Sequence, residues 1–149
     1  MKVKIITGQD FNEPVVEIKC HEVTKEIENL VNTINKMFIN IAGKKDGETF
    51  ILNLDDIYYF EAVENRVFAY MKEEVYEVDY KIAELVTLLS RTTFIQTSRT
   101  IILNINKINK IRSIVNGRIM AVLVNDEKMI ISRLYANSFK NKLKGGISQ

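Results

Sequence analysis

The chain has 149 residues, of which 46% are apolar and 27% are charged, which suits one globular domain or one domain with a short appendage. Its 21 Lys and Arg against 19 Asp and Glu give a formal charge of +2, which argues against a histone-like polycation and an acidic disordered tail. One cysteine excludes an intrachain disulfide, and one histidine excludes a zinc site built from three or four Cys and His ligands. The longest charge-free stretches have seven residues, far short of the roughly 20 apolar residues that span a membrane. We therefore expect a soluble, cytoplasmic protein without membrane insertion, metal or cofactor.

The charge is unevenly distributed along the chain. Residues 1–42 hold 5 basic and 6 acidic side chains, residues 43–90 hold 5 and 11, and residues 91–149 hold 11 and 2. The three segments therefore carry −1, −6 and +9. The strongly basic last segment predicts a polyanionic partner such as nucleic acid, whereas the alternative is that its charged faces fold against the acidic middle.

The first 40 residues are predicted to form an extension of two short strands and one helix. Residues 3–6 and 15–18 are β-like runs, separated by a turn-rich stretch that holds the only proline, Pro14. From Thr24, which suits a helix N-cap, apolar residues recur at helical spacing up to Phe38. This amphipathic helix is either a dimerisation contact or a helix that packs on its own hairpin.

Residues 41–149 are predicted to form the main domain, which is mostly β (α+β). The stretch AGKKDGET predicts a turn, and Asn116-Gly117 is a strong hairpin signal because both residues tolerate the positive φ of a type I′ turn. Residues 81–90 have helical spacing, and a terminal helix is predicted from Ser132 to a stop at Gly145-Gly146. The predicted strands are 49–54, 57–63, 66–71, 75–79, 94–103, 110–115, 118–124 and 129–131.

No arrangement in the sequence requires an enzyme. The single histidine, His21, lies beside Cys20 between a predicted strand and a helix, where neighbouring side chains rarely converge for catalysis. Asp55 and Asp56 could in principle bind a divalent cation, but adjacent acids at strand ends and turns are usually solvated. Catalysis is therefore the least favoured class of function.

Arginines at turns and strand ends are the remaining feature with a recognisable chemistry. Arg66 follows a tight acidic turn between two predicted strands, Arg99 lies in the polar stretch 96–100, and Arg133 begins the last helix. A guanidinium group on a rigid turn suits bidentate hydrogen bonds to guanine or phosphate, and a helix N-terminus adds partial positive charge. Taken singly, each arginine is a weak signal, and a surface charge that has no partner is the more frequent explanation.

Together these positions resemble the LytTR family of bacterial DNA-binding domains. The resemblance rests on four blocks in the family's order and spacing, and it covers roughly residues 41–144. The blocks are DIYYFEA at 56–62 followed by Asn65-Arg66-Val67, the stretch 94–108 around Ser98-Arg99-Thr100, the hairpin Asn116-Gly117-Arg118, and Ile131-Ser132-Arg133 with Tyr135.

The resemblance implies a stack of small antiparallel sheets whose loops, and not a recognition helix, enter successive major grooves of double-stranded DNA. It also implies a stand-alone transcriptional regulator without a receiver domain, and tandem half-sites favour a homodimer. The family often has a basic residue at the position of Gln96 and a histidine at that of Ser98, so this chain departs from the pattern there. The implied DNA-binding residues are Asn65 and Arg66 in the first loop, Ser98 and Arg99 in the second, and Arg133 at the helix start, with Arg118 from the hairpin.

Within this hypothesis the basic residues divide into two groups. Arg66, Arg99 and Arg133 are expected to reach base edges, and the expected phosphate contacts are residues such as Lys107, Lys110, Arg112 and Arg118. Two other functions stay open: a β-rich protein-interaction module whose acidic middle binds a basic partner, and a binder of single-stranded nucleic acid. The latter usually exposes aromatic residues beside basic ones, whereas the aromatic residues here alternate as core positions.

Overall fold

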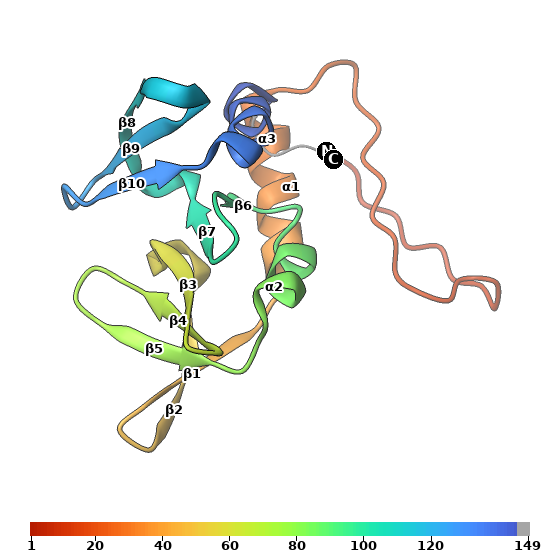
Figure 1. Cartoon of the computed structure of the whole chain (residues 1–149). Helices are drawn as coiled ribbons and strands as arrows, with labels where there is room; N and C mark the ends of the chain where they lie inside the picture. The colour runs from red at the N-terminus through yellow and green to blue at the C-terminus, as the bar shows by residue number, and fades with distance from the viewer. Residues whose placement is uncertain (146–149) are drawn as a thin grey trace.

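The computed structural model describes residues 1–145, which contain three α-helices and two antiparallel sheets of seven and three strands (Figure 1). The mostly β architecture expected from the sequence is confirmed. The helices are α1 (Lys25–Met37), α2 (Ile82–Leu88) and α3 (Arg133–Gly145). The strands are β1 (Ile41–Lys45), β2 (Glu48–Leu52), β3 (Tyr59–Val63), β4 (Arg66–Tyr70), β5 (Val75–Val78), β6 (Phe94–Gln96), β7 (Ile101–Asn104), β8 (Ile108–Ser113), β9 (Ile119–Leu123) and β10 (Lys128–Ile131).

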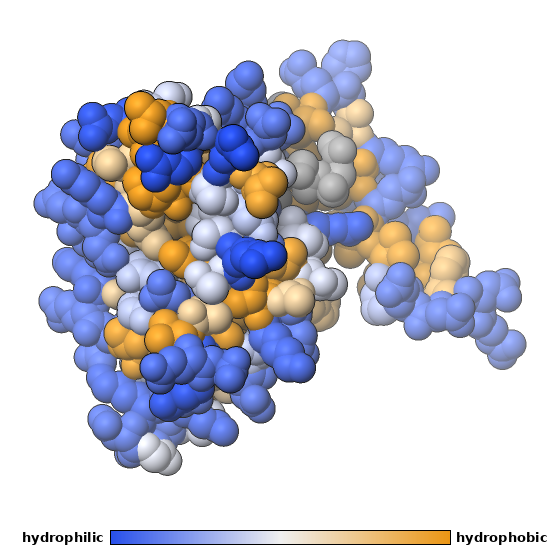
Figure 2. Space-filling model, in the orientation of Figure 1, coloured by the Kyte–Doolittle hydropathy of each residue, from blue (hydrophilic) through white to orange (hydrophobic). Residues whose placement is uncertain are grey.

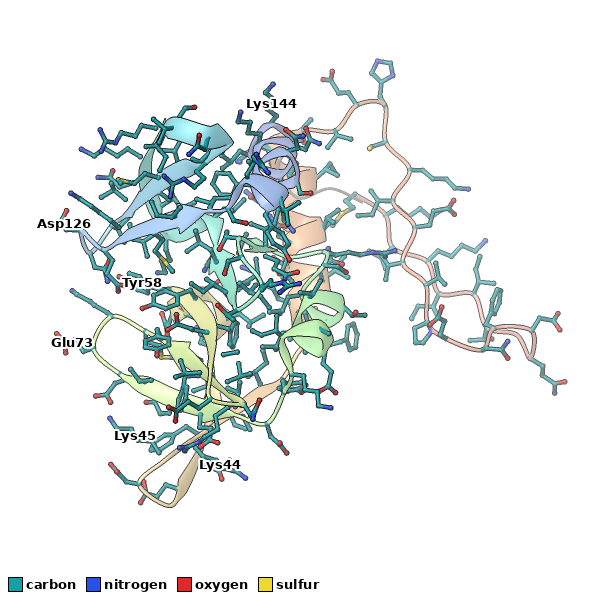
Figure 3. All side chains as sticks on the ribbon, in the orientation of Figure 1. Lys44, Lys45, Tyr58, Glu73, Asp126 and Lys144 are labelled. Carbon is teal, nitrogen blue, oxygen red and sulfur yellow. The ribbon has the colours of Figure 1, made fainter. Side chains whose placement is uncertain are left out.

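The larger sheet, sheet A, separates two hydrophobic cores. Its strand order is β2-β1-β5-β4-β3-β7-β6, and the smaller sheet B has the order β10-β9-β8. Successive side chains of a strand point to opposite faces, so Phe60 packs with Leu85 of α2, while its neighbour Tyr59 packs on the other side with Leu103 and with Phe139 of α3. Sheet B completes the second core, and Tyr58 lies where the two sheets meet (Figure 3). The domain is therefore layered, as the family resemblance implies.

Tight turns with positive φ connect most strand pairs. The β3–β4 turn places Glu64 at φ 51° and Asn65 at φ 66°, and the β8–β9 connection places Asn116 at 64° and Gly117 at 72°. These values confirm the acidic turn and the positive φ expected at Asn116-Gly117, since asparagine and glycine adopt the left-handed region at low cost. The β8–β9 connection is longer than the expected type I′ turn, because Ser113 pairs with Ile119 and Val115–Gly117 forms a 3₁₀ turn. Because the β3–β4 turn has only two residues, Val63 pairs directly with Arg66.

One strand, β1, is not predicted from the sequence. The stretch AGKKDGET was expected to be a turn throughout, but Ile41–Lys45 is strand β1, and only Asp46 and Gly47 form the turn to β2. The consecutive lysines and glycines resemble a loop, yet β1 is paired on both sides, with β2 and with β5. A Cβ at Gly43 would lie 2.6 Å from the Cβ of Tyr76, so close packing in the sheet requires glycine there.

The predicted strand 94–103 is two strands. Phe94–Gln96 and Ile101–Asn104 pair with each other as β6 and β7, and residues 97–100 form the connecting loop. Apolar residues flank the short polar stretch on both sides, so the sequence looks like one strand. The alternation of apolar and polar residues does not show where the chain reverses direction. Ser98 and Arg99 therefore lie on a loop, as the family resemblance implies, and not inside the strand that the apolar pattern predicts.

The expected N-terminal strand pair is wrong. Residues 1–24, the N-terminal arm, contain no strand and extend away from the domain (Figure 1). Their apolar side chains lie exposed among polar ones (Figure 2), with Val3 at 80%, Ile5 at 85% and Val15 at 77% exposure. An isolated two-stranded hairpin is at best marginally stable in water. Within the described residues no other element covers the arm, so a hairpin there would lack the packing that stabilises one.

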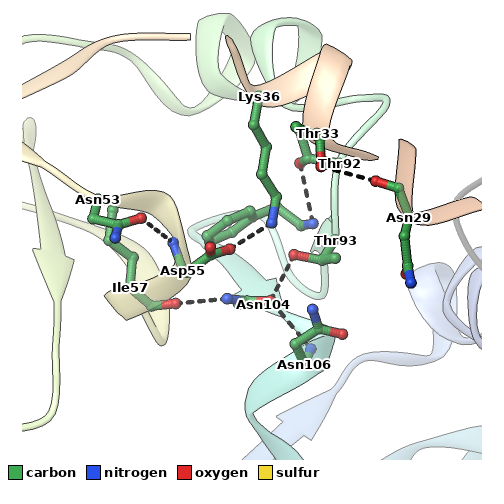
Figure 4. Close-up of polar contacts among 11 residues, drawn as sticks. Asn29, Thr33, Lys36, Asn53, Asp55, Ile57, Thr92, Thr93, Asn104 and Asn106 are labelled. Carbon is green, nitrogen blue, oxygen red and sulfur yellow. Dashed lines mark hydrogen bonds and ion pairs between the residues drawn. The ribbon is translucent and has the colours of Figure 1, made fainter. Parts of the chain in front are cut away.

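The amphipathic helix is confirmed as α1, and it packs on the domain rather than on a hairpin. The Thr24 hydroxyl accepts a hydrogen bond from the amide of Ile27, as an N-cap should. Near its C-terminal end, Lys36 Nζ lies 2.5 Å from Asp55 Oδ1 (Figure 4), and Asn35 Nδ2 donates to the carbonyl of Arg91. Helix α3 follows Ser132 directly and includes Gly145, while Gly146 of the expected Gly145-Gly146 stop lies outside the described residues.

Candidate nucleic-acid interface

The first predicted loop presents Asn65 and Arg66 at the end of the β3–β4 hairpin. Asn65 is exposed in the turn, and Arg66 is the first residue of β4. The Arg66 guanidinium donates from Nε to Glu77 Oε1 at 3.0 Å and from Nη2 to Glu77 Oε2 at 2.5 Å, and it lies 5.2 Å from the ring centroid of Phe68. These hydrogen bonds from Arg66 hold the pKa of the Glu77 carboxyl below its ordinary value.

The second predicted loop, between β6 and β7, is fixed by backbone hydrogen bonds at both ends. Thr97 donates to the carbonyl of Ile101, and the carbonyl of Thr100 accepts from the amide of Ala62 in β3 at 2.9 Å. The Ser98 hydroxyl accepts from the amide of Thr100 within the loop. Arg99 is exposed at its tip. The loop is therefore ordered by its own strands and by β3.

The start of α3 is joined to this second loop and to the β8–β9 hairpin. The amide of Ser132 donates to the carbonyl of Thr97 at 3.0 Å. The side chain of Arg133 lies over Gly117, where a Cβ would come within 3.1 Å of Arg133 Cγ. Arg118 Nε donates to the carbonyl of Val115 at 3.3 Å within the hairpin.

These contacts connect the second loop with the start of α3 and, through Arg133, with the β8–β9 hairpin, while Ala62 of β3, two residues before the β3–β4 turn, connects the second loop with the first hairpin. The connected segments run from β3–β4 through the β6–β7 loop to the start of α3 and the β8–β9 hairpin. We call residues 64–66, 97–100, 116–118 and 132–133 the loop row. It contains all six residues predicted to bind DNA, which are Asn65, Arg66, Ser98, Arg99, Arg118 and Arg133.

Of the expected phosphate contacts outside the loop row, two lie together on sheet B. Lys110 and Arg112, with Lys128 from β10, border a hollow of about 370 Å³ that Ile111, Met120 and Val122 complete. Lys107 lies elsewhere, with Nζ 4.9 Å from the ring centroid of Tyr58. The basic residues therefore flank the loop row without forming one uniform patch.

The basic segment is not neutralised by the acidic middle. Every ion pair within residues 1–145 joins partners from residues 1–90, such as Lys36 with Asp55 and Arg66 with Glu77. Lys45 pairs with Glu74 in the same part of the chain. Within the described residues, the basic segment therefore makes no ion pair with the acidic middle, although one of its lysines, Lys142, is buried.

Three supporting residues were not found from the sequence. Asn104 is 1% exposed; its Nδ2 donates to the Ile57 carbonyl at 2.9 Å, and its Oδ1 accepts from Thr93 Oγ1 at 2.8 Å (Figure 4). Lys142, 9% exposed, donates to two backbone carbonyls, and burial lowers its pKa. The third residue is Glu77. Only Asn104 belonged to a recognised block, and its partners are distant in sequence.

The domain matches a known family along most of its length. Residues 47–144 match the family model described as the LytTr DNA-binding domain. The chain belongs to the LytTR family. Its membership covers all four segments of the loop row, from the β3–β4 turn to the start of α3.

The curated proteins that the chain resembles include one that is longer and one of similar length. The chain is 29% identical over 137 residues to the sensory transduction protein LytT of Enterococcus faecalis, covering 89% of this chain and 57% of that protein. It thus spans little more than half the length of that relative. It is 24% identical over 145 residues to an uncharacterized HTH-type transcriptional regulator of Staphylococcus aureus, covering 96% of this chain and 98% of that protein.

A solved LytTR structure confirms the fold. The LytTr DNA-binding domain of a Bacillus cereus protein superposes with a TM-score of 0.64 at 24% identity, covering 71% of this chain and 96% of that one. At this identity the match shows the fold alone. Among residues 1–145, no helix has both the length and the apolar composition needed to cross a membrane.

Proposed function

We propose that this LytTR chain is a sequence-specific double-stranded DNA-binding transcriptional regulator of the cytoplasm, and not an enzyme. The loop row is the observation that carries the proposal. Four segments from different parts of the chain carry Arg66, Arg99 and Arg133 and are connected by backbone hydrogen bonds through β3 and by the contact of Arg133 with Gly117, and within the described residues the basic segment has no carboxylate partner at ion-pair distance. Family membership, the sensory transduction name of the Enterococcus faecalis relative and the transcriptional regulator name of the Staphylococcus aureus relative support the same function.

In the proposed mechanism, loops and a helix start read successive major grooves. Arg66, Arg99 and Arg133 donate to base edges, and Asn65 and Ser98 lie beside them in the same loops. Phosphate contacts from Lys107, Lys110, Arg112 and Arg118 set the overall affinity and the register on the duplex.

Single substitutions test this division of roles on a duplex selected from random DNA. Arg99→Ala should cost about 1–3 kcal/mol on the selected site and relax base preference at one position. Lys110→Ala should instead weaken binding to selected and random duplexes alike, and reduce the slope of log K against log salt by about 0.9. Equal losses on specific and random DNA for Arg66→Ala, Arg99→Ala and Arg133→Ala would refute the assigned roles.

We also propose a homodimer formed through the N-terminal arm and α1. The arm has exposed apolar residues in a β-like pattern, among them Val3, Ile5 and Val15, which a second copy would cover. Light scattering of the full chain should give a dimer mass, and a chain lacking residues 1–23, which retains the Thr24 cap, should give a monomer mass. A monomeric full chain, or a dimer that survives the deletion, contradicts a dimer formed through the arm.

A further inference from the structure

The Arg66 guanidinium is held by two hydrogen bonds to Glu77 and by the ring of Phe68. Glu77 on β5 is the register partner of Phe68 on β4, and Arg66 lies two residues before Phe68, so all three side chains share one face of sheet A. The two hydrogen bonds to Glu77 fix the guanidinium from the side, and Phe68 supports it 5.2 Å from its ring centroid. Neighbouring strands therefore hold Arg66 in one orientation.

The hydrogen bonds to Glu77 leave the other donors of Arg66 free. A guanidinium has five N–H groups in one plane. Glu77 accepts one from Nε and one from Nη2, so the Nη1 hydrogens and the second Nη2 hydrogen point away from the carboxylate. That Nη1–Nη2 edge is the pair of parallel donors that matches O6 and N7 of guanine in the major groove.

Electrostatics alone would disfavour a carboxylate at this position. Glu77 is ionised at neutral pH, as a glutamate with an ordinary pKa is, and the hydrogen bonds from Arg66 lower its pKa further. A fixed negative charge beside the DNA backbone repels phosphate, so a carboxylate here lowers affinity unless it does something else. Lys44, its register partner on β1, offsets part of that charge.

We propose that Glu77 is a positioning residue that determines specificity, because it holds Arg66 with its Nη1–Nη2 edge presented to a guanine. This inference rests on the proposed DNA-binding function and adds a residue of β5, outside the loop row, to the recognition apparatus. An arginine fixed before binding loses less side-chain freedom when it forms a bidentate contact. Glu77 thus acts through Arg66 and does not itself touch the base.

The sign of the effect of Glu77→Gln tests this proposal. With the full chain and its selected duplex, Glu77→Gln should lower affinity by about fivefold or more and weaken guanine preference at the position that Arg66→Ala also relaxes. Glu73→Gln is the matched control, since it removes the same charge from the turn at the far end of the β4–β5 hairpin (Figure 3). The control should keep the base preference and bind DNA equally or more tightly.

A double variant separates positioning from simple repulsion. In the Arg66→Ala background, Glu77→Gln should no longer lower affinity, because the side chain that it positions is absent. Tighter binding by Glu77→Gln alone, or unchanged guanine preference, overturns the positioning role while leaving DNA recognition intact. Failure of the unmodified chain to enrich any duplex overturns the proposed function together with this inference.

Discussion

The buried side-chain amide of Asn104 connects three parts of the domain by hydrogen bonds. Asn104, at the end of β7, binds the carbonyl of Ile57, the hydroxyl of Thr93 and the amide of Asn106 (Figure 4). Its donor and acceptor atoms therefore all have partners, which is the condition under which a buried polar group stabilises a fold. Asn104 lies at the end of β7 away from the second loop, where it pairs with Phe94 of β6.

Replacing Asn104 with alanine should lower the free energy of unfolding by about 1–3 kcal/mol. The Ile57 carbonyl and the Thr93 hydroxyl would stay buried and lose their partner. Urea denaturation followed by circular dichroism measures the loss, with Asn106→Ala, an exposed neighbour, as the control. Equal stability of the two variants would show that the network contributes little.

The Tyr59 hydroxyl should make the free energy of unfolding decrease as the pH rises in the alkaline range. Burial and the 2.9 Å hydrogen bond to Glu127 raise the pKa of Tyr59 above its ordinary value. The unfolded chain therefore releases this proton first, near pH 10, and native stability falls as the pH rises through that value. The stability advantage of the natural chain over Tyr59→Phe should shrink between pH 8 and pH 11. A constant difference across that range would contradict this linkage.

Sequence patterns identified the candidate DNA-binding residues, but they did not identify the side chains that hold those residues or the fold in place. The arginines of the loop row were recognisable from their blocks, whereas Glu77, Lys142 and the role of Asn104 were not. Each of these three acts through a residue that is 11 or more positions away, such as Glu77 with Arg66 or Lys142 with Phe94. Spacing along the chain carries no direct signal for such contacts.

Among the elements, the β8–β9 hairpin and the start of α3 depend on each other. Gly117 has φ +72°, and its missing Cβ leaves space for the side chain of Arg133. Gly47, in the β1–β2 turn, has a similar φ of +78° but nothing within 4 Å of an added Cβ. The two glycines therefore share a backbone requirement and differ in their contacts.

Gly117→Ala and Gly47→Ala should each cost about 1 kcal/mol of stability, because alanine disfavours positive φ. Only Gly117→Ala should also weaken binding to the selected duplex several-fold, since its Cβ must displace Arg133. Thermal unfolding and a gel shift on both variants measure the two effects separately. Equal DNA binding by the two variants would show that Arg133 does not depend on this contact.

Most element boundaries followed from local rules, and the failures share a physical cause. The spacing of apolar residues and the Thr24 cap located α1, and positive-φ residues located the turns. Strand β1 was missed and the strands of the arm were expected in error, because strands depend on partners that a local pattern does not reveal. In β1 the partners exist on both sides, and in the arm the described chain supplies none.

At the scale of the whole molecule, a net charge of +2 results from two unequal parts. Acids and bases of residues 1–90 pair with one another, while the described basic segment has no carboxylate partner within ion-pair distance. The two hydrophobic cores lie on opposite faces of sheet A. The loop row is formed by two turns of sheet A, the β8–β9 hairpin of sheet B and the start of α3. A few arginines on that row, with flanking lysines, suit a specific DNA binder better than a general polyanion binder.

The most direct test is selection of bound fragments from random duplex DNA with the full chain. We predict an enriched sequence made of short blocks about one helical turn, roughly 10 base pairs, apart, because successive major grooves are read. Arg66→Ala, Arg99→Ala and Arg133→Ala should each erase preference at a different position of that sequence. Recovery of unenriched random fragments would contradict sequence-specific recognition and favour a protein-interaction module.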